Sequence, residues 1–133
     1  MRLAEPATIN IGTRQLIHFR RGYYAYVGSA MGGLEARVRR HFRKDKKRHW
    51  HIDYLLERAY LTGAILCETG QRSECAIAHA LQAQLGSVPG FGVSDCHCPS
   101  HLFFSGNGNK LQSTILTAVT SLGICPEYRD IVA

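Results

Sequence analysis

The fold is decided by the stretch GYYAYVGSA, residues 22–30. Its aromatic and β-branched residues favour a strand over 22–27, and the small residues Gly28-Ser29-Ala30 end that strand. The Gly32-Gly33 pair then allows the chain to turn into a helix predicted over 34–44, where apolar residues recur every four positions. The central unit of the predicted fold is therefore a strand that turns tightly into a helix.

The segments on either side of this unit predict a mixture of strands and helices. Strands are expected over 8–11 and 15–19, 61–67 and 101–105, and helices over 52–60, 73–85 and 111–122, with 88–100 as a loop. Ser73 is a suitable N-cap for the second of these helices. Strands with helices inserted between them predict an α+β fold, with a small mixed β-sheet of about three strands flanked by helices.

Length and composition restrict the class of protein. The chain has 133 residues, of which 45% are hydrophobic, and this fits one domain over 1–133 with its own core. No apolar run is long enough to span a membrane, and the N-terminus lacks the pattern of a signal peptide. These features and the odd number of cysteines, five, predict reduced thiols and a cytoplasmic protein without a membrane partner.

The excess positive charge is confined to one segment. Residues 37–48 hold eight basic residues and one acid, a net charge of +7, and the rest of the chain carries a net charge of −1. A concentrated cationic block binds a polyanion by releasing counterions from its phosphates, although a solvated basic face without a partner is the simpler alternative. The predicted nucleic-acid-binding residues are Arg39, Arg40, Arg43, Lys44, Lys46, Lys47, Arg48, His49, Trp50 and His51.

Three side chains near this block have the chemistry that phosphodiester cleavage needs. Tyr26 places a phenol at a strand end, Arg37 a guanidinium on the next helix, and Glu74 a carboxylate on a later helix. Such groups can activate water, stabilise charge in the transition state and hold a hard cation. Taken singly, each also fits a structural role: a half-buried strand aromatic, a surface arginine, and an acid that favours a helix dipole.

The same residues resemble a known nuclease superfamily. Tyr26-Val27-Gly28 is similar to the second half of the GIY-YIG signature, and Leu34, Arg37 and His41 recur at the spacing of the helix that follows it. Glu74 matches the later helix that supplies a metal-binding glutamate. The blocks GYYAYVGSA, GGLEARVRRH, HWHIDYLL and FGVSDCHCPSHLF resemble the Uri-type branch, over roughly residues 5–105.

This resemblance implies a fold and a set of roles. It implies a GIY-YIG-like domain and a metal-dependent DNA endonuclease, with structure-selective or weakly sequence-selective cleavage of single- or double-stranded DNA. Tyr26 would orient or activate the attacking water, Arg37 would contact the scissile phosphate, and His41 would assist the leaving group or the water network. Glu74 would bind Mg²⁺ or Mn²⁺. An arginine suits the phosphate because its fork is bidentate and stays charged.

The first half of the signature, a Gly-Ile-Tyr on an earlier strand, is not found in this sequence. Either the domain is truncated at its N-terminus or the first strand is replaced, and Tyr24, on the same strand face as Tyr26, is a candidate substitute. Two other functions therefore stay open. One is a catalytically impaired nucleic-acid-binding module of the same fold, and the other is a zinc-stabilised structural domain with an incidental basic face.

Two further clusters offer chemistry. In His49-Trp50-His51-x-Asp53, Asp53 can orient either histidine, and Trp50 can stack on a base or pack in the core. Cys96, Cys98 and His101 lie within six residues and offer three zinc ligands, which Cys75 or His49 can complete to a tetrahedron. Buried thiols, or a disulfide from Cys75 to the loop, are the alternatives to Zn²⁺.

Overall fold

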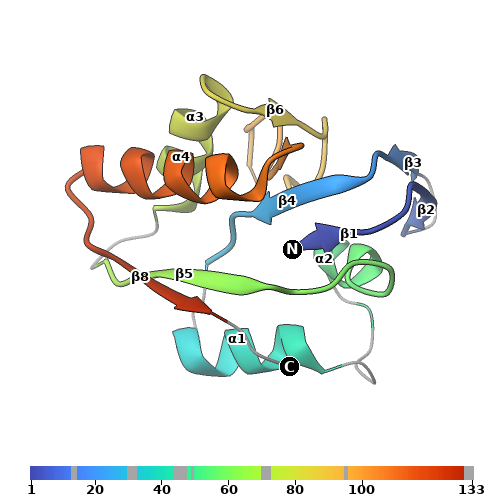
Figure 1. Ribbon diagram of the computed structural model, residues 1–133, viewed down its shortest axis with the longest axis horizontal. Coiled ribbons are helices and arrows are strands. Elements are labelled where there is room, and N and C mark those ends of the chain that lie inside the picture. The colour runs from blue at the N-terminus through green and yellow to red at the C-terminus, as the bar shows by residue number, and fades with distance from the viewer. Residues whose placement is uncertain are drawn as a thin grey trace.

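The computed structural model describes residues 1–12, 15–29, 33–43, 48, 50–69, 73–94 and 96–130. These residues form eight strands and four helices, which confirms the predicted α+β class (Figure 1). The central sheet has four strands in the order β1-β4-β7-β6, all paired antiparallel. Its strands are β1 (Arg2–Leu3), β4 (Gly22–Tyr26), β7 (Leu102–Ser105) and β6 (Gly86–Ser87).

The central sheet corrects the expectation of a mixed sheet of about three strands. The added strands β1 and β6 have two residues each, too few for a period-two pattern to be recognised. Every pairing among the described strands is antiparallel, whereas a mixed sheet would also contain a parallel pair.

Two separate two-stranded ribbons flank the central sheet. The first is the hairpin of β2 (Ala7–Ile11) and β3 (Gln15–Phe19), predicted from the sequence, in which Gly12 adopts a φ of +68° at the turn. The second pairs β5 (Gly63–Cys67) with β8 (Pro126–Asp130), a strand that was not predicted from the sequence. The helices are α1 (Leu34–Phe42), α2 (His51–Leu55), α3 (Glu74–Gln82) and α4 (Gly108–Ser121).

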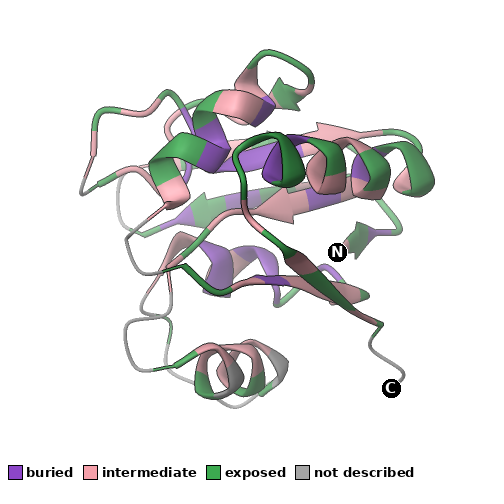
Figure 2. Ribbon diagram, turned by 90° about the vertical axis from the view of Figure 1, so that its left-hand side faces the viewer, coloured by how far each residue is buried: buried purple, intermediate pink, exposed green. Residues whose placement is uncertain are grey.

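Two apolar clusters hold these elements together. Helices α3 and α4 cover one face of the central sheet, where Leu81, Phe103 and Val119 are buried. The other cluster joins α2, the β2–β3 hairpin and the β6–β7 loop through Phe19, Leu55 and Phe91. Figure 2 shows the buried stretches, in purple, on the helices and on the strands of the central sheet.

Helix α2 is shorter than the predicted helix over 52–60. It ends at Leu55, and Tyr60 instead forms an isolated bridge with Arg2, with N–H···O distances of 2.8 and 2.9 Å in the two directions. This bridge needs extended backbone at Tyr60 and ends the helical conformation. The chain then enters β5, which lies between the central sheet and α1 (Figure 1).

Candidate active site and metal cluster

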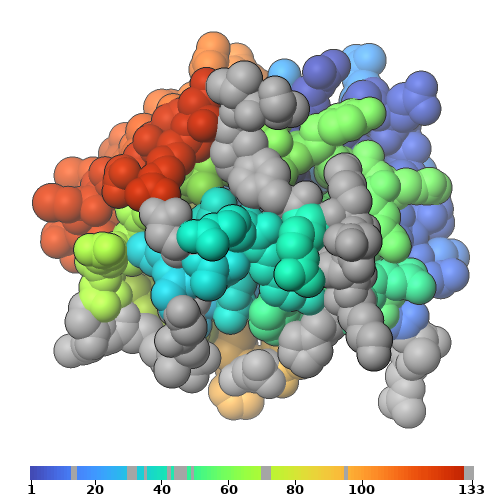
Figure 3. Space-filling model, turned by 90° about the horizontal axis from the view of Figure 1, so that it is seen from below, coloured from blue at the N-terminus to red at the C-terminus, as the bar shows by residue number. Residues whose placement is uncertain are grey.

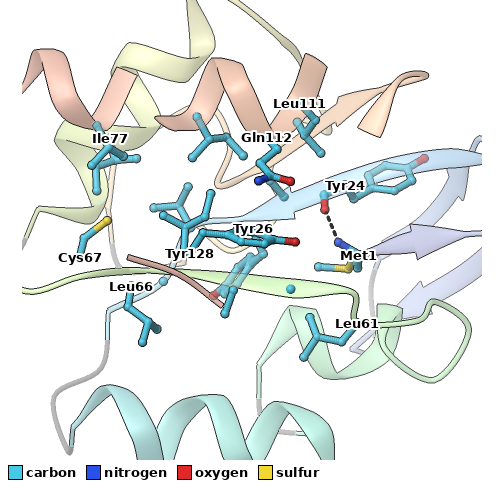
Figure 4. A pocket seen from close by; sticks show the side chains of 18 of the residues that line it. Met1, Tyr24, Tyr26, Leu61, Leu66, Cys67, Ile77, Leu111, Gln112 and Tyr128 are labelled. Atoms are coloured by element: carbon cyan, nitrogen blue, oxygen red, sulfur yellow. Dashed lines mark hydrogen bonds between the residues drawn. The ribbon is translucent and has the colours of Figure 1, made fainter. Parts of the chain in front are cut away.

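A cleft of about 1340 Å³ opens beside the edge of β4. Its walls come from β4, β5, α1, α3 and α4, and it is lined by Tyr26, Arg37, His41 and Glu74 among others. The fold therefore brings all four predicted catalytic residues, from three elements, to one cavity. Figure 4 shows Tyr26 and Tyr128 in the space between β4 and β5, with Ile77, Leu111 and Gln112 on the side of α3 and α4.

Tyr26 is the last residue of β4 and is half-buried. Its ring meets the ring of Phe91 edge-on, with 6.1 Å between the centroids. Gly92 lies so close that a Cβ atom there would come within 2.8 Å of Tyr26 Cε1, and its φ is +71°. The Phe91-Gly92 turn, which lies in the loop predicted over 88–100, therefore fixes the position of the Tyr26 ring.

Tyr24 has a different environment from Tyr26, although both lie on one face of β4. Tyr24 is 2% exposed, and its hydroxyl donates a hydrogen bond to the carbonyl of Arg20 at 2.6 Å. Burial raises the pKa of Tyr24. Burial makes the Tyr24 hydroxyl harder to ionise and the hydrogen bond engages its proton, so Tyr24 is a weak substitute for the first tyrosine of the signature that the sequence resembles.

Arg37 and His41 lie one turn apart on the face of α1 that borders the cleft. The Arg37 guanidinium carbon lies 4.1 Å from the centroid of the Trp50 ring, and that of Arg40 lies 4.1 Å from it as well. The ring of His41 lies 6.3 Å from the same indole. Trp50 thus holds Arg37 by cation–π contact, in addition to packing against the core.

Arg40 is bound to a buried carboxylate. Its Nη1 and Nη2 donate to Asp53 Oδ1 and Oδ2 at 2.9 and 3.0 Å, and Asp53 Oδ2 also accepts from the main-chain N–H of Trp50 at 2.9 Å. The pair joins α1 to α2. Asp53, predicted to orient a histidine, thus holds Arg40 and the start of α2.

The remaining basic residues form the outer surface near α1. Arg39 and Arg43 are exposed, and with Ala36 and Arg40 they line a hollow of about 490 Å³. Arg48 lies 3.6 Å from Glu57 and over the ring of Tyr54. Figure 3 shows α1 in the middle of this lower face. Lys44, Lys46, Lys47 and His49 lie outside the described residues.

His51 has a structural environment. Its Nδ1 accepts a hydrogen bond from the main-chain N–H of Gly92 at 2.8 Å, and its ring meets Phe91 edge-on at 5.5 Å. Burial lowers the pKa of His51. The hydrogen bond requires an unprotonated Nδ1, so His51 supports the turn beneath Tyr26 as a neutral side chain.

Glu74 begins α3, is half-buried and borders the cleft. The next residue, Cys75, belongs to a cluster with Cys96, Cys98 and His101, whose ligand atoms all lie within 4.8 Å of one another. His101 Nε2 is 3.7 Å from Cys96 Sγ and 3.9 Å from Cys75 Sγ. All five cysteines of the chain are free thiols.

This Cys₃His cluster has the composition and compactness of the metal site predicted from the sequence, and of the two candidates for the fourth ligand the structure places Cys75 in it. Burial and the neighbouring thiols of Cys75 and Cys96 raise the pKa of Cys98 to about 12. A bound cation would reverse that shift, because it favours the thiolate over the thiol. The main-chain carbonyl of His101 accepts a hydrogen bond from the Val27 N–H at 2.9 Å, which fixes the backbone of this histidine beside the end of β4.

Comparison with known proteins gives one match. The model of a family described as "Domain of unknown function DUF123" matches residues 1–124. The chain belongs to the DUF123 family. No curated protein and no solved structure matches it. The stretch shared with DUF123 includes the whole cleft wall from β4 to α4 and all four members of the Cys₃His cluster.

Some residues of the DUF123 cleft were not predicted from the sequence. Tyr128 and Gln112 line it, and the β8 strand that carries Tyr128 was missed because PEYRD has no alternating pattern. The Tyr128 ring packs over Gly63 of the paired strand, where a Cβ atom would lie 2.7 Å from the Tyr128 hydroxyl. None of the described helices in this DUF123 chain is long and apolar enough to cross a membrane.

Proposed function

We propose that this DUF123 chain is a metal-dependent DNA endonuclease of the GIY-YIG type. The observation that carries the proposal is that Tyr26, Arg37, His41 and Glu74, from β4, α1 and α3, line one cleft. These are the positions that the resemblance to the Uri-type branch assigns to catalysis. A phenol, a guanidinium, an imidazole and a carboxylate in one cavity supply each function that phosphodiester hydrolysis needs.

The carboxylate of Glu74 suits Mg²⁺ or Mn²⁺. Mg²⁺ is usually held by one or two carboxylates together with phosphate oxygens of the substrate, and Glu74 offers carboxylate oxygens at the border of the cleft. A bound divalent ion would neutralise charge on the phosphate and lower the pKa of a coordinated water.

The side chains of the cleft divide the remaining work. Arg37 donates two hydrogen bonds to the non-bridging oxygens of the scissile phosphate and stabilises the charge that grows there. The Tyr26 hydroxyl orients the water that attacks phosphorus. His41 gives a proton to the oxygen that leaves as the phosphorus–oxygen bond breaks. Trp50 holds the Arg37 guanidinium beside the cleft before DNA arrives.

DNA is the partner that the surface charge favours. Arg39 is exposed on α1, the helix that carries Arg37, and Arg43 is exposed at its C-cap, so this end of the molecule offers cations to backbone phosphates. Contacts of this kind are made to the backbone and do not read base edges. We therefore propose structure-selective or weakly sequence-selective cleavage.

The Cys₃His cluster would hold a second, different ion, which we propose to be Zn²⁺. Three thiolates and one imidazole match the soft and borderline ligands that zinc prefers, and four protein ligands leave no open position for a substrate. The zinc ion would therefore be structural. The hydrolytic ion belongs to Glu74 instead.

The test is cleavage of single-stranded, nicked and duplex DNA by purified protein with Mg²⁺ or Mn²⁺. We expect Glu74→Gln to abolish cleavage and Arg37→Ala to lower its rate by about 10²–10³-fold. Tyr26→Phe should lower the rate, and Tyr24→Phe should retain it, since the Tyr24 hydroxyl is bound to Arg20. Glu5→Gln, at an exposed acid, is the charge control.

Two results would contradict the proposal. Cleavage that survives in Glu74→Gln would show a contaminating nuclease or another site. DNA binding without any cleavage, in wild-type protein and variants alike, would instead support a nucleic-acid-binding module.

A further inference from the structure

We infer that the metal of the Cys₃His cluster positions the cleft, by tying the Tyr26 end of β4 to the Glu74 end of α3. The inference rests on the proposed function only where it predicts that the metal affects DNA cleavage. Its structural content is that one ion, outside the cleft, connects the two elements that supply a phenol and a carboxylate to it. The cluster would thus be a positioning site, with no contact to substrate.

The first connection runs through α3. Cys75 follows Glu74 directly, and both lie in the first turn of that helix. The middle of α3 is fixed by apolar packing of Ile77, Ala78 and Leu81, but its first turn lies outside that packing. Cys75 is exposed, so a metal bond at its Sγ would be the anchor of this turn, and hence of Glu74.

The second connection runs through the β6–β7 loop, which supplies Cys96, Cys98 and His101. The carbonyl of His101 accepts a hydrogen bond from the Val27 N–H at 2.9 Å. The N–H of His101 in turn donates to the Phe91 carbonyl at 2.9 Å. His101 therefore links the metal cluster to the residue after Tyr26 and to the turn beneath its ring.

Glu74 is also near His101, because the residue that follows it, Cys75, has its Sγ 3.9 Å from His101 Nε2. The two sites are thus neighbours. A metal bound to Cys75, Cys96, Cys98 and His101 would join the first turn of α3 to the β6–β7 loop by bonds to one ion. Without the metal, Cys75 meets the loop through weaker contacts, such as the one between its Sγ and His101 Nε2 at 3.9 Å.

Zinc content, the absorption of bound cobalt and the mass of the protein test the metal itself. Zinc content should be one ion per chain in wild-type protein and in Cys125→Ser, which removes an exposed thiol outside the cluster, and should be lost in Cys98→Ser. Cobalt(II) should give the visible absorption of a tetrahedral thiolate site in wild-type protein and in Cys125→Ser, but not in Cys98→Ser. Protein without metal, or with a mass two hydrogens lower because two thiols formed a disulfide, would overturn the inference.

Amide hydrogen exchange tests the positioning without any nuclease assay. We expect loss of zinc, by chelation or in Cys98→Ser, to speed exchange of the Val27 and Ile77 amides by about tenfold or more, and Cys98→His to restore both metal and protection. The Thr8–Ile11 amides of the hairpin serve as the internal control. Unchanged exchange after metal loss would overturn the inference, even if the protein cleaves DNA.

The two proposals also separate in the cleavage assay. Zinc-loaded protein that shows the exchange effect but cleaves no DNA contradicts the nuclease and supports the positioning site. Zinc-free protein that cleaves DNA at the wild-type rate supports the nuclease and contradicts the positioning site.

Discussion

Arg40 and Asp53 form a bidentate ion pair, with N–O distances of 2.9 and 3.0 Å, that joins α1 to α2. Asp53 is 1% exposed, although the many charges around its partner Arg40 favour a solvated surface. The pair explains why a short, highly charged helix docks beside the cleft. Arg37, one turn earlier, is thereby held at the border of the cleft.

Loss of the arginine in this pair should destabilise the protein. Arg40→Met leaves the buried Asp53 carboxylate with fewer donors, and we expect the free energy of unfolding to fall by about 3 kcal/mol. Arg39→Met, at the exposed neighbouring position, should change it by less than about 0.5 kcal/mol. Urea denaturation measures both. Equal effects of the two variants would show that the pair does not hold α1.

Two exposed arginines, Arg39 on α1 and Arg43 at its C-cap, should affect DNA binding rather than the stability of the protein. We expect Arg39→Gln and Arg43→Gln each to weaken binding and to reduce the slope of log K against log salt by about 0.9, the effect of one lost phosphate contact. Lys110→Gln, on α4, removes the same charge from another face and should leave the slope unchanged. A slope that responds equally to all three changes would indicate a diffuse charge effect.

Two glycines of one turn separate a backbone effect from a contact with Tyr26. Gly90 and Gly92 have φ values of +77° and +71°, so alanine costs about 1–2 kcal/mol of unfolding free energy at either position. At Gly92 the added Cβ also meets the Tyr26 ring, whereas at Gly90 the nearest atom is 3.4 Å away. Gly92→Ala should therefore be the more destabilised variant in urea denaturation and the slower in DNA cleavage. Equal stability and equal rates would show that Gly92 does not position Tyr26.

Stability should fall in mildly acidic solution because of His51. Its pKa is lower in the folded protein than its ordinary value of 6.5, so the unfolded chain binds more protons as the pH drops below that value. The free energy of unfolding should then decrease from about pH 6.5 downward and level off below the folded pKa.

His51→Gln isolates the contribution of His51, because glutamine can accept the Gly92 hydrogen bond without titrating. Urea denaturation at pH 7.5 and pH 5.5 should show a smaller loss in the variant than in wild-type protein. An identical loss in both would assign the pH dependence elsewhere.

Much of this fold follows from local sequence patterns. The β2–β3 hairpin, β4, α1 and α4 were predicted close to their observed bounds, because turn glycines and apolar periodicity mark them directly. The Cys₃His set was predicted as well, since three of its ligands lie within six residues. The strands β1, β6 and β8 were not, because a two-residue strand or one without alternation exists only through its pairing partner.

The partners of charged side chains were harder to predict than the site itself. Nothing in the sequence distinguishes Arg40, held by Asp53, from Arg39, which is exposed. The distinction depends on which way α1 turns against α2, and that is set by packing between segments far apart in sequence. Similarly, Trp50 was a candidate for base stacking, but two guanidinium groups already lie over its ring.

That arrangement gives the molecule a built-in optical reporter. Trp50 is the single tryptophan of the chain, and its ring touches the arginine that we assign to the scissile phosphate. When Arg37 leaves the indole for a phosphate, the surroundings of the fluorophore change. Intrinsic emission can therefore time the arrival of DNA in the cleft in unlabelled protein, before any bond is broken.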